Sequence, residues 1–168
     1  MAITFKKDGH GQVEPNHLSA PRDGGVYAQL PAASSIKVLE NGMFVKYDYA
    51  NGECNFTGDG AWMLVFNEEK LYDERYQMHK HFAQKVADSY DGKIYPRVFR
   101  LSLGDLYTTN TFKDNESVKV GDIVAPGSDG FLTVQDPEKL PDGLLLKVVK
   151  EYTLPDAQDA VKLQVISE

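Results

Sequence analysis

Hydrophobic residues in this chain recur mostly in short runs separated by glycine and proline, a pattern typical of β-strands. Residues 26–30 and 36–39 are two such runs, and residues 43–49 follow after Asn41-Gly42. One face of the strand predicted over 43–49 is more apolar and is expected to face the core: Met43, Val45, Tyr47 and Tyr49. Asn-Gly is the dipeptide that a tight type I′ turn prefers, so the sequence predicts a hairpin that joins 36–39 to 43–49.

The next stretch combines a strand with a strong helical pattern. Residues 62–66 are continuously apolar, as expected of a strand that is buried on both faces. Asn67 offers a helix N-cap, and the two glutamates that follow it suit the positive end of the helix dipole. Apolar positions from Leu71 to Val86 recur at helical spacing. They predict an amphipathic helix of about five turns that ends at Asp91-Gly92.

The rest of the chain predicts further strands. Alternation over residues 97–103 places Phe99, Leu101 and Leu103 toward the core, and Gly104-Asp105 predicts a tight connection to a strand over 106–111. Five more short runs are divided by Gly and Pro turns: residues 117–120, 123–125, 131–134, 144–150 and 161–166. Closely spaced strands of this kind are typical of a small barrel or sandwich.

These patterns predict an α+β fold that is mainly β. We expect antiparallel sheets that form a small barrel or sandwich, one principal α-helix and an extended N-terminal arm. Residues 26–168 are expected to form the β-rich globular domain. Loop-forming residues permit a subdivision near 112–117, whereas Phe112 favours packing of that segment.

Residues 1–25, the predicted arm, are rich in glycine and proline and show neither the strand nor the helix period. Four spaced apolar residues are its candidate anchors: Ile3, Phe5, Val13 and Leu18. One interpretation is a disordered terminus. The other is an extended arm that lies across a neighbouring subunit and becomes ordered on binding.

The composition is that of an ordinary globular protein, with 42% hydrophobic and 26% charged residues among 168. Eighteen basic and twenty-five acidic residues give a net charge of −7. This charge argues against direct binding of nucleic acid, because that affinity depends on Lys and Arg neutralising phosphates. The N-terminal residues lack the apolar core of a signal peptide, and no run approaches the roughly 18–20 apolar residues of a transmembrane helix. We therefore expect a soluble protein that is made in a cytoplasm and has no membrane partner.

No motif predicts catalysis, a metal site or a cofactor. Cys54 is the single cysteine, so it forms no intrachain disulfide or thiolate cluster. His79 and His81 would lie on different faces of the predicted helix, which does not suit a shared metal. Ser128 lies between glycines without the spacing of a nucleophile elbow, and a tight hairpin loop explains it. We expect no catalytic residue, no metal ligand and no cofactor.

The stretch over residues 62–112 resembles a family of small virion proteins of tailed bacteriophages that are encoded near the major capsid protein. The matching residues read LVFNEEKLYDER, HKHFAQ and YPRVFRLSLGDLYTTNTF. The upstream segment YAQLPAASSIKVLENGMFVKYDY fits the same family. The downstream VKVGDIVAPGSDGFLTV is similar to the glycine-punctuated β modules of capsid decoration proteins. The resemblance covers residues 26–134 and leaves the arm outside.

This resemblance implies a non-enzymatic structural protein of the virion. Such a protein binds the major capsid protein lattice of a tailed phage head and reinforces or decorates it. The expected partners are the major capsid protein and either further copies of this chain or a head fibre. The expected location is the capsid surface, after synthesis in the host cytoplasm. The resemblance itself identifies no contact residues, so the arm anchors remain the candidates.

Two other classes of function stay open. A carbohydrate- or receptor-binding module of a head fibre or tail would use exposed aromatic residues, and the chain has nine tyrosines and eight phenylalanines. Aromatic residues also fill β cores, so composition does not separate these possibilities. An enzyme, for example a hydrolase, would need catalytic residues that converge from distant loops.

Overall fold

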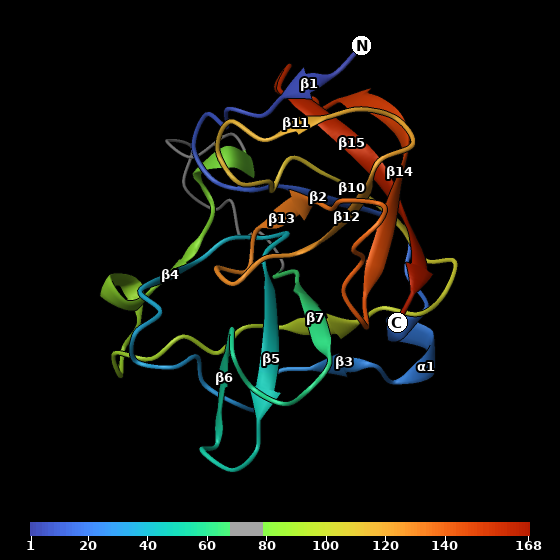
Figure 1. The fold of residues 1–168 in the computed structure, drawn as a ribbon. Coiled ribbons are helices and arrows are strands. Elements are labelled where there is room, and N and C mark those ends of the chain that lie inside the picture. The colour runs from blue at the N-terminus through green and yellow to red at the C-terminus, as the bar shows by residue number, and fades with distance from the viewer. Residues whose placement is uncertain (68–78) are drawn as a thin grey trace.

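Two antiparallel β-sheets make up most of the protein. Figure 1 shows the computed structural model, which describes residues 1–67 and 79–168. The larger sheet has the strand order β13 (Leu132–Val134), β12 (Ile123–Pro126), β14 (Leu145–Thr153), β15 (Asp159–Ser167), β10 (Leu106–Thr109) and β2 (Val13–His17). The smaller sheet has the order β3 (Val26–Tyr27), β9 (Val98–Arg100), β7 (Trp62–Val65), β5 (Phe44–Asp48) and β6 (Glu53–Asn55).

Short elements complete the described part of the chain. Two strand pairs form: β1 (Ile3–Thr4) with β11 (Ser117–Val118), and β4 (Val38–Leu39) with β8 (Gln84–Lys85). The described helices are α1 (Ala20–Asp23) and the 3₁₀ turns η2 (His79–His81) and η3 (Val86–Asp88). The predicted class, an α+β fold that is mainly β with antiparallel sheets, is confirmed, and the sheets do not close into a barrel.

The two large sheets share one core. It contains Phe44, Leu64 and Phe99 from the five-stranded sheet, together with Tyr107, Leu146 and Leu163 from the six-stranded sheet. Both strands that flank residues 112–117 contribute to this core or its edge, and Phe112 itself is 1% exposed. Packing of the shared core therefore runs across residues 112–117.

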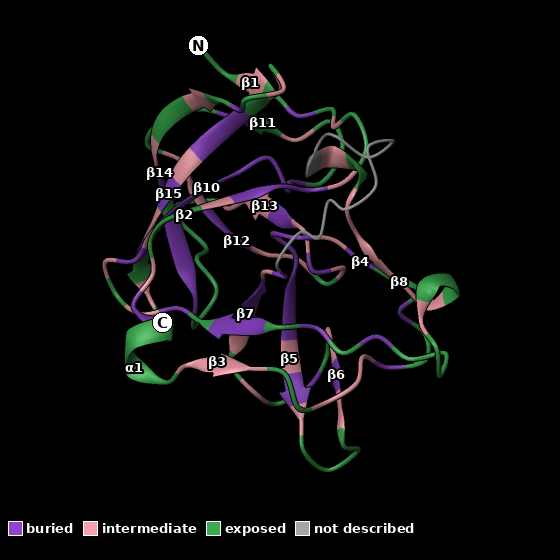
Figure 2. Ribbon diagram, turned by 180° about the vertical axis from the view of Figure 1, so that it is seen from behind, coloured by how far each residue is buried: buried purple, intermediate pink, exposed green. Residues whose placement is uncertain are grey.

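A second core lies on the opposite face of the five-stranded sheet. Val45, Met63 and Val98 point into it, and Leu39 of β4 and Ile94 from the loop before β9 cover it. The five-stranded sheet is therefore buried on both faces, as predicted for residues 62–66, and in Figure 2 much of β5 and β7 is coloured as buried.

Burial on both faces also corrects some predicted orientations. The alternation that places Val45 and Phe99 toward the core would turn the neighbouring Phe44 and Val98 outward, but both are fully buried because a second layer covers those faces. Tyr49 and Leu103 were assigned to the core, but they are 74% and 67% exposed. Tyr49 directly follows β5, and Leu103 lies three residues after the end of β9, so both lie outside the paired strands.

The predicted five-turn helix is wrong over its second half. Its first half, residues 68–78, lies outside the described residues. The remainder forms η2, then strand β8, then η3. Gln84 and Lys85 pair with Leu39 and Val38, and the Val86 N–H donates to the Lys37 carbonyl over 3.0 Å. Tertiary pairing with β4 therefore overrides the helical spacing of the apolar residues.

The predicted hairpin is also wrong, although its turn exists. Gly42 has φ 91°, and the Met43 N–H donates to the Glu40 carbonyl over 3.3 Å. Asn41 is not among the described residues with positive φ, so the turn is not type I′, which needs positive φ at both central positions. The strand before the turn pairs with β8 and the strand after it pairs with β6 and β7, so the two do not pair with each other.

Residues 1–25 are part of the domain and not a separate arm. β2 is the edge strand of the six-stranded sheet and pairs with β10, while β1 pairs with β11. The Phe5 ring stacks on Phe112 with centroids 4.4 Å apart. The segment is therefore not a disordered terminus, and its residues Phe5 and Val13 pack within this chain rather than across a neighbouring subunit.

A buried polar run in and after β10 holds the N-terminal segment in place. Thr109 Oγ1 donates to the Gln12 carbonyl (2.7 Å), and the Gln12 N–H donates to Asn110 Oδ1 (2.8 Å). Thr111 Oγ1 donates to the Asn41 carbonyl over 2.8 Å. Thr109, Asn110 and Thr111 are at most 1% exposed, so each of these bonds satisfies a group that water does not reach.

A nearly buried ion pair adds a second link. Lys7 Nζ lies 2.7 Å from Glu40 Oε2, and their side chains are 8% and 14% exposed. The Gly11 N–H donates to the same carboxylate over 2.7 Å. Burial alone would raise the pKa of Glu40, but the hydrogen bonds from Lys7 and Gly11 and the charge of Lys7 outweigh it, so the pKa lies below its usual value.

Deleting residues 1–18 should abolish cooperative folding. The deletion removes Phe5 and Val13 from the core. It also removes the Gln12 backbone groups that pair with Thr109 Oγ1 and Asn110 Oδ1, so the combined loss is more than about 5 kcal/mol. Urea unfolding followed by circular dichroism measures this loss. Deleting only Met1 and Ala2, both exposed, is the control and should leave the midpoint unchanged. An intact, cooperative transition in the longer deletion would contradict the packing described above.

Replacing Glu40 by Gln should destabilise the protein by about 3 kcal/mol at pH 7, because Lys7 would be left nearly buried without its counter-charge. The folded-state pKa of Glu40 is lowered, so its contribution is present above the unfolded value near 4.5 and is lost as pH falls through the folded value. The difference in free energy of unfolding between wild type and Glu40→Gln should therefore shrink below about pH 4. Urea titrations from pH 7 to pH 3 test this, and a constant difference would rule it out.

Candidate functional site

The four candidate anchors of the N-terminal segment all pack within this chain. Phe5 and Val13 are 2% and 7% exposed and belong to the shared core, and Ile3 and Leu18 pack against that core. The apolar surface of Phe5 and Val13 is therefore largely used by the fold of the protein itself, whereas Ile3 and Leu18 stay partly exposed. Contact residues for a partner have to be sought among side chains that remain exposed.

The two residues considered for catalysis lie in a buried strand and in a hairpin loop. Cys54 is fully buried in β6, and burial raises the pKa of its thiol to about 12, so the thiolate nucleophile is suppressed. Ser128 lies in the β12–β13 hairpin loop, where the Gly127 N–H donates to the Phe131 carbonyl over 2.7 Å. This hairpin loop is as predicted.

The described residues contain no group of three or more His, Cys, Asp or Glu side chains placed to hold a metal ion. His79 and His81 are the ends of the turn η2. His10 Nδ1 lies 3.4 Å from Glu40 Oε1, beside the Lys7 ion pair. That carboxylate is already engaged by Lys7 and Gly11, so it serves the packing of the N-terminal segment.

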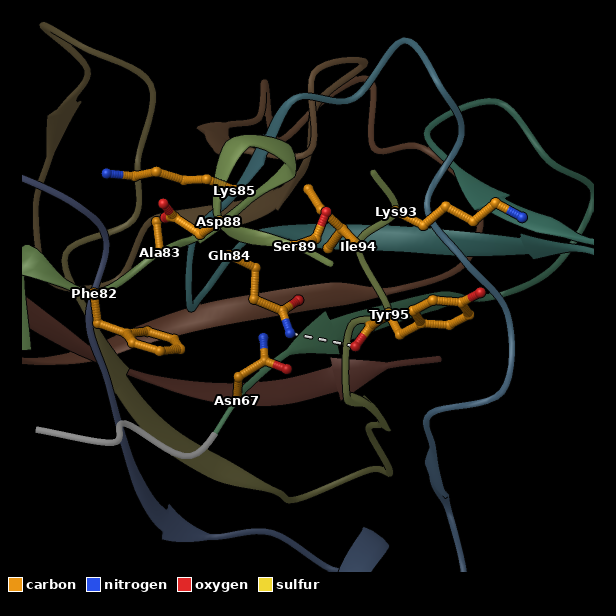
Figure 3. A pocket seen from close by; sticks show the side chains of 10 residues that line it. All are labelled: Asn67, Phe82, Ala83, Gln84, Lys85, Asp88, Ser89, Lys93, Ile94 and Tyr95. Atoms are coloured by element: carbon orange, nitrogen blue, oxygen red, sulfur yellow. Dashed lines mark hydrogen bonds between the residues drawn. The ribbon is translucent and has the colours of Figure 1, made fainter. Parts of the chain in front are cut away.

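A pocket of about 460 Å³ lies where β8 and η3 face the segment that leads into β9. Figure 3 shows its lining, with the aromatic rings of Phe82 and Tyr95 at either side of two amide side chains, Asn67 and Gln84. Tyr95 is 43% exposed and Asn67 is 6% exposed, so the pocket runs from the surface to a buried amide. Its volume falls in the range of about 300–1,000 Å³ that is usual for small-molecule sites.

Charged and hydroxyl side chains surround the same pocket. Lys85, Asp88 and Lys93 line it, together with Ser89, whose hydroxyl donates to the Val86 carbonyl over 2.8 Å. The pocket thus combines aromatic surface with hydrogen-bonding groups of both kinds, the mixture expected of a site for a polar organic ligand.

A row of three tyrosines forms a second candidate surface, which we call the tyrosine row: Tyr27, Tyr47 and Tyr49. The ring centroids of Tyr27 and Tyr47 are 5.8 Å apart, and those of Tyr47 and Tyr49 are 5.7 Å apart, both pairs edge to face. Tyr47 is 3% exposed and its hydroxyl accepts a hydrogen bond from the Gln29 N–H (3.3 Å). Burial raises the pKa of Tyr47. Tyr49, at the end of the row, is therefore an exposed ring that packs against the buried and hydrogen-bonded ring of Tyr47.

Sequence reasoning did not find these surfaces. It assigned Asn67 to the start of a helix, whereas in the structure Asn67 Oδ1 accepts a hydrogen bond from the Arg97 N–H over 2.8 Å. No pattern in the sequence around Gln84 indicates that this residue lines a pocket. Tyr49 was assigned to the core by alternation. The high tyrosine content was the one signal that pointed toward an aromatic surface.

Comparison of the chain with protein-family models, with curated proteins and with solved structures finds no match. Among the described residues, no helix has the length and apolar character needed to cross a membrane.

Cys54 should be chemically inert in the folded protein. With a pKa of about 12 its thiolate fraction at pH 8 is far below that of an unperturbed thiol, and the side chain is fully buried. Alkylation by iodoacetamide at pH 8, followed by mass spectrometry, should be at least about 100-fold slower in buffer than in 8 M urea. Equal rates in the two conditions would show that Cys54 is accessible and reactive.

Proposed function

We propose that this chain is a non-enzymatic structural protein of a tailed-phage virion, and that it binds the major capsid protein lattice and reinforces or decorates it. The resemblance of residues 26–134 to small head-associated proteins motivates the proposal. The single structural observation that supports it most is the tyrosine row, which presents Tyr49 on a rigid β scaffold.

Tyr49 has the properties of an interface anchor. Tyrosine is enriched in protein–protein interfaces because its ring buries a large apolar area and its hydroxyl still finds a polar partner. Packing against Tyr47 limits the motion of the Tyr49 ring before binding, so less conformational entropy is lost when a partner covers it. At 74% exposure most of the ring is available to that partner.

The β scaffold supports this role through its rigidity. Strand β5, which ends next to Tyr49, is paired on both sides and is buried on both faces of its sheet. A lattice-binding protein needs such a fixed surface rather than a catalytic cleft. On a symmetric shell modest contacts are repeated at every site, so each copy needs only moderate affinity.

The test is binding to capsids that were assembled without this chain. Purified protein is mixed with such capsids, before and after capsid expansion, and co-sedimentation on a density gradient measures the bound fraction. We expect saturable binding to at least one of the two capsid states. Absence of binding to both would overturn the proposal.

Replacing Tyr49 by Ala should weaken capsid binding by about tenfold or more, because truncating an interface tyrosine commonly costs over 1 kcal/mol. The variant should fold normally, since Tyr49 is 74% exposed. Tyr90→Ala is the matched control, because Tyr90 is a fully exposed tyrosine outside the tyrosine row. If Tyr49→Ala binds capsids with wild-type affinity, the tyrosine row is not part of the interface. The capsid-binding test above would then still decide the function.

A further inference from the structure

A groove of about 590 Å³ lies between the N-terminal strand β1 and the turn end of the β14–β15 hairpin. Residues 1–4 line one side, and residues 150–153 of β14, together with Asp159 of β15, line the other. We call it the edge groove. Figures 1 and 2 both show β1 beside the end of this hairpin. β1 and β14 belong to different sheets and do not pair with each other.

β14 has a free backbone edge where it lines the edge groove. Its pairing with β12 is limited to Leu146 and Lys147, so residues 150–153 have a strand partner only on the β15 side. The Leu154 N–H donates to the Gln158 carbonyl over 2.9 Å, so the backbone of Leu154 faces across the hairpin. Backbone groups in an antiparallel pair alternate in direction, so the N–H and C=O groups of Glu151 and Thr153 face away from β15.

β1 has a free edge of the same kind. The Phe5 N–H donates to the Glu116 carbonyl, and the Phe5 carbonyl accepts from the Asn115 N–H, each over 2.9 Å. The backbone of Phe5 therefore faces the β11 side, and by alternation the N–H and C=O groups of Ala2 and Thr4 face the opposite side. In the described part of the chain β11 is the strand that pairs with β1. A strand edge with unpaired backbone groups thus borders the edge groove on each side.

An extended peptide is the ligand that matches two strand edges. Its N–H and C=O groups point alternately to its two sides, with the same repeat along the chain as the strands that flank it. Natural proteins usually block a free edge with proline or a bulge. Pro15 lies in the middle of the edge strand β2, whereas residues 150–153 contain no proline and the irregularity of β14 lies before Lys150. The edge of β14 is therefore open to pairing.

We propose that the edge groove accepts an extended segment of a partner protein as an added strand, held by the backbone groups of Thr4, Glu151 and Thr153. Under the proposed function, on which this identification of the partner rests, the segment belongs to the major capsid protein. Strand addition derives its affinity from main-chain hydrogen bonds, so it complements the side-chain contact made by Tyr49.

The direct test is an NMR titration of the full chain, labelled with ¹⁵N, with the peptide acetyl-Thr-Val-Thr-Val-Thr-amide, whose β-branched residues favour the extended conformation. The backbone amide signals of Thr4, Glu151 and Thr153 should shift in a saturable way with a Kd of about millimolar, as expected for a short peptide held by a few hydrogen bonds. Absence of saturable shifts at these residues up to about 20 mM peptide would overturn the proposal.

A matched peptide separates backbone recognition from side-chain recognition. Methylation of both valine nitrogens keeps every side chain but removes two N–H donors and blocks the approach of a neighbouring strand. We expect this peptide to bind at least about tenfold more weakly. Equal affinity of the two peptides would show that the groove does not bind a strand through its backbone, and the proposal would be wrong.

Replacing Glu151 by Pro tests the β14 edge. Proline removes the N–H that faces the groove and leaves the groups that face β15, so peptide affinity should fall by about fivefold or more. Glu151→Ala is the matched control, because it removes the exposed side chain and keeps the N–H, and its peptide affinity should equal that of wild type. Wild-type affinity in Glu151→Pro would contradict the proposal, and the methylated peptide decides the question independently if this variant does not fold.

Hydrogen exchange on capsids tests the identity of the partner. When the protein is bound to capsids, the amides of Thr4, Glu151 and Thr153 should exchange at least about tenfold more slowly than in the free protein. Capsid binding without this slowing would show that the major capsid protein does not supply the strand, and this identification would be wrong. Absence of capsid binding would instead overturn the proposed function, while the peptide titrations would still decide whether the edge groove binds a strand.

Discussion

The buried polar run Thr108–Thr111 is the constraint on which the arrangement of the whole protein depends. All four side chains are at most 1% exposed, and polar groups in such positions destabilise a fold unless they are paired. Their partners come from Asn16 and Gln12 of the N-terminal segment and from the Asn41 carbonyl. Three parts of the chain that are far apart in sequence must therefore meet at β10.

Glycine at position 42 is part of the same constraint. Its φ of 91° lies in the left-handed region, and a Cβ there would collide with the hydroxyls of Thr109 and Thr111. The close approach lets Thr111 reach the Asn41 carbonyl. The Asn-Gly pair thus serves the contact between the loop and β10 rather than a hairpin between neighbouring strands.

Burial of the five-stranded sheet on both faces has a further consequence for function. The covering layer brings β8 and the segment before β9 next to the end of β7, and the Tyr95 and Arg97 backbone groups there hold Gln84 and Asn67. In the described part of the chain this layer contains loops and the short β4–β8 pair, and the pocket is lined by residues of this layer. Both candidate surfaces, the pocket and the tyrosine row, therefore belong to the side of the sheet that faces away from the six-stranded sheet.

The sequence by itself determined what is local. Strand segments such as 62–66, 106–111 and 161–166 and turns such as those at residues 104–105 and 127–130 could be predicted, because side-chain alternation and turn chemistry act over a few residues. Only the tertiary structure decided the partners: β4 with β8 instead of β5, Phe5 with Phe112 instead of a neighbouring subunit, and Asn67 with Arg97. Strand pairing and the covering of a sheet face depend on contacts between residues distant in the chain, which no local period encodes.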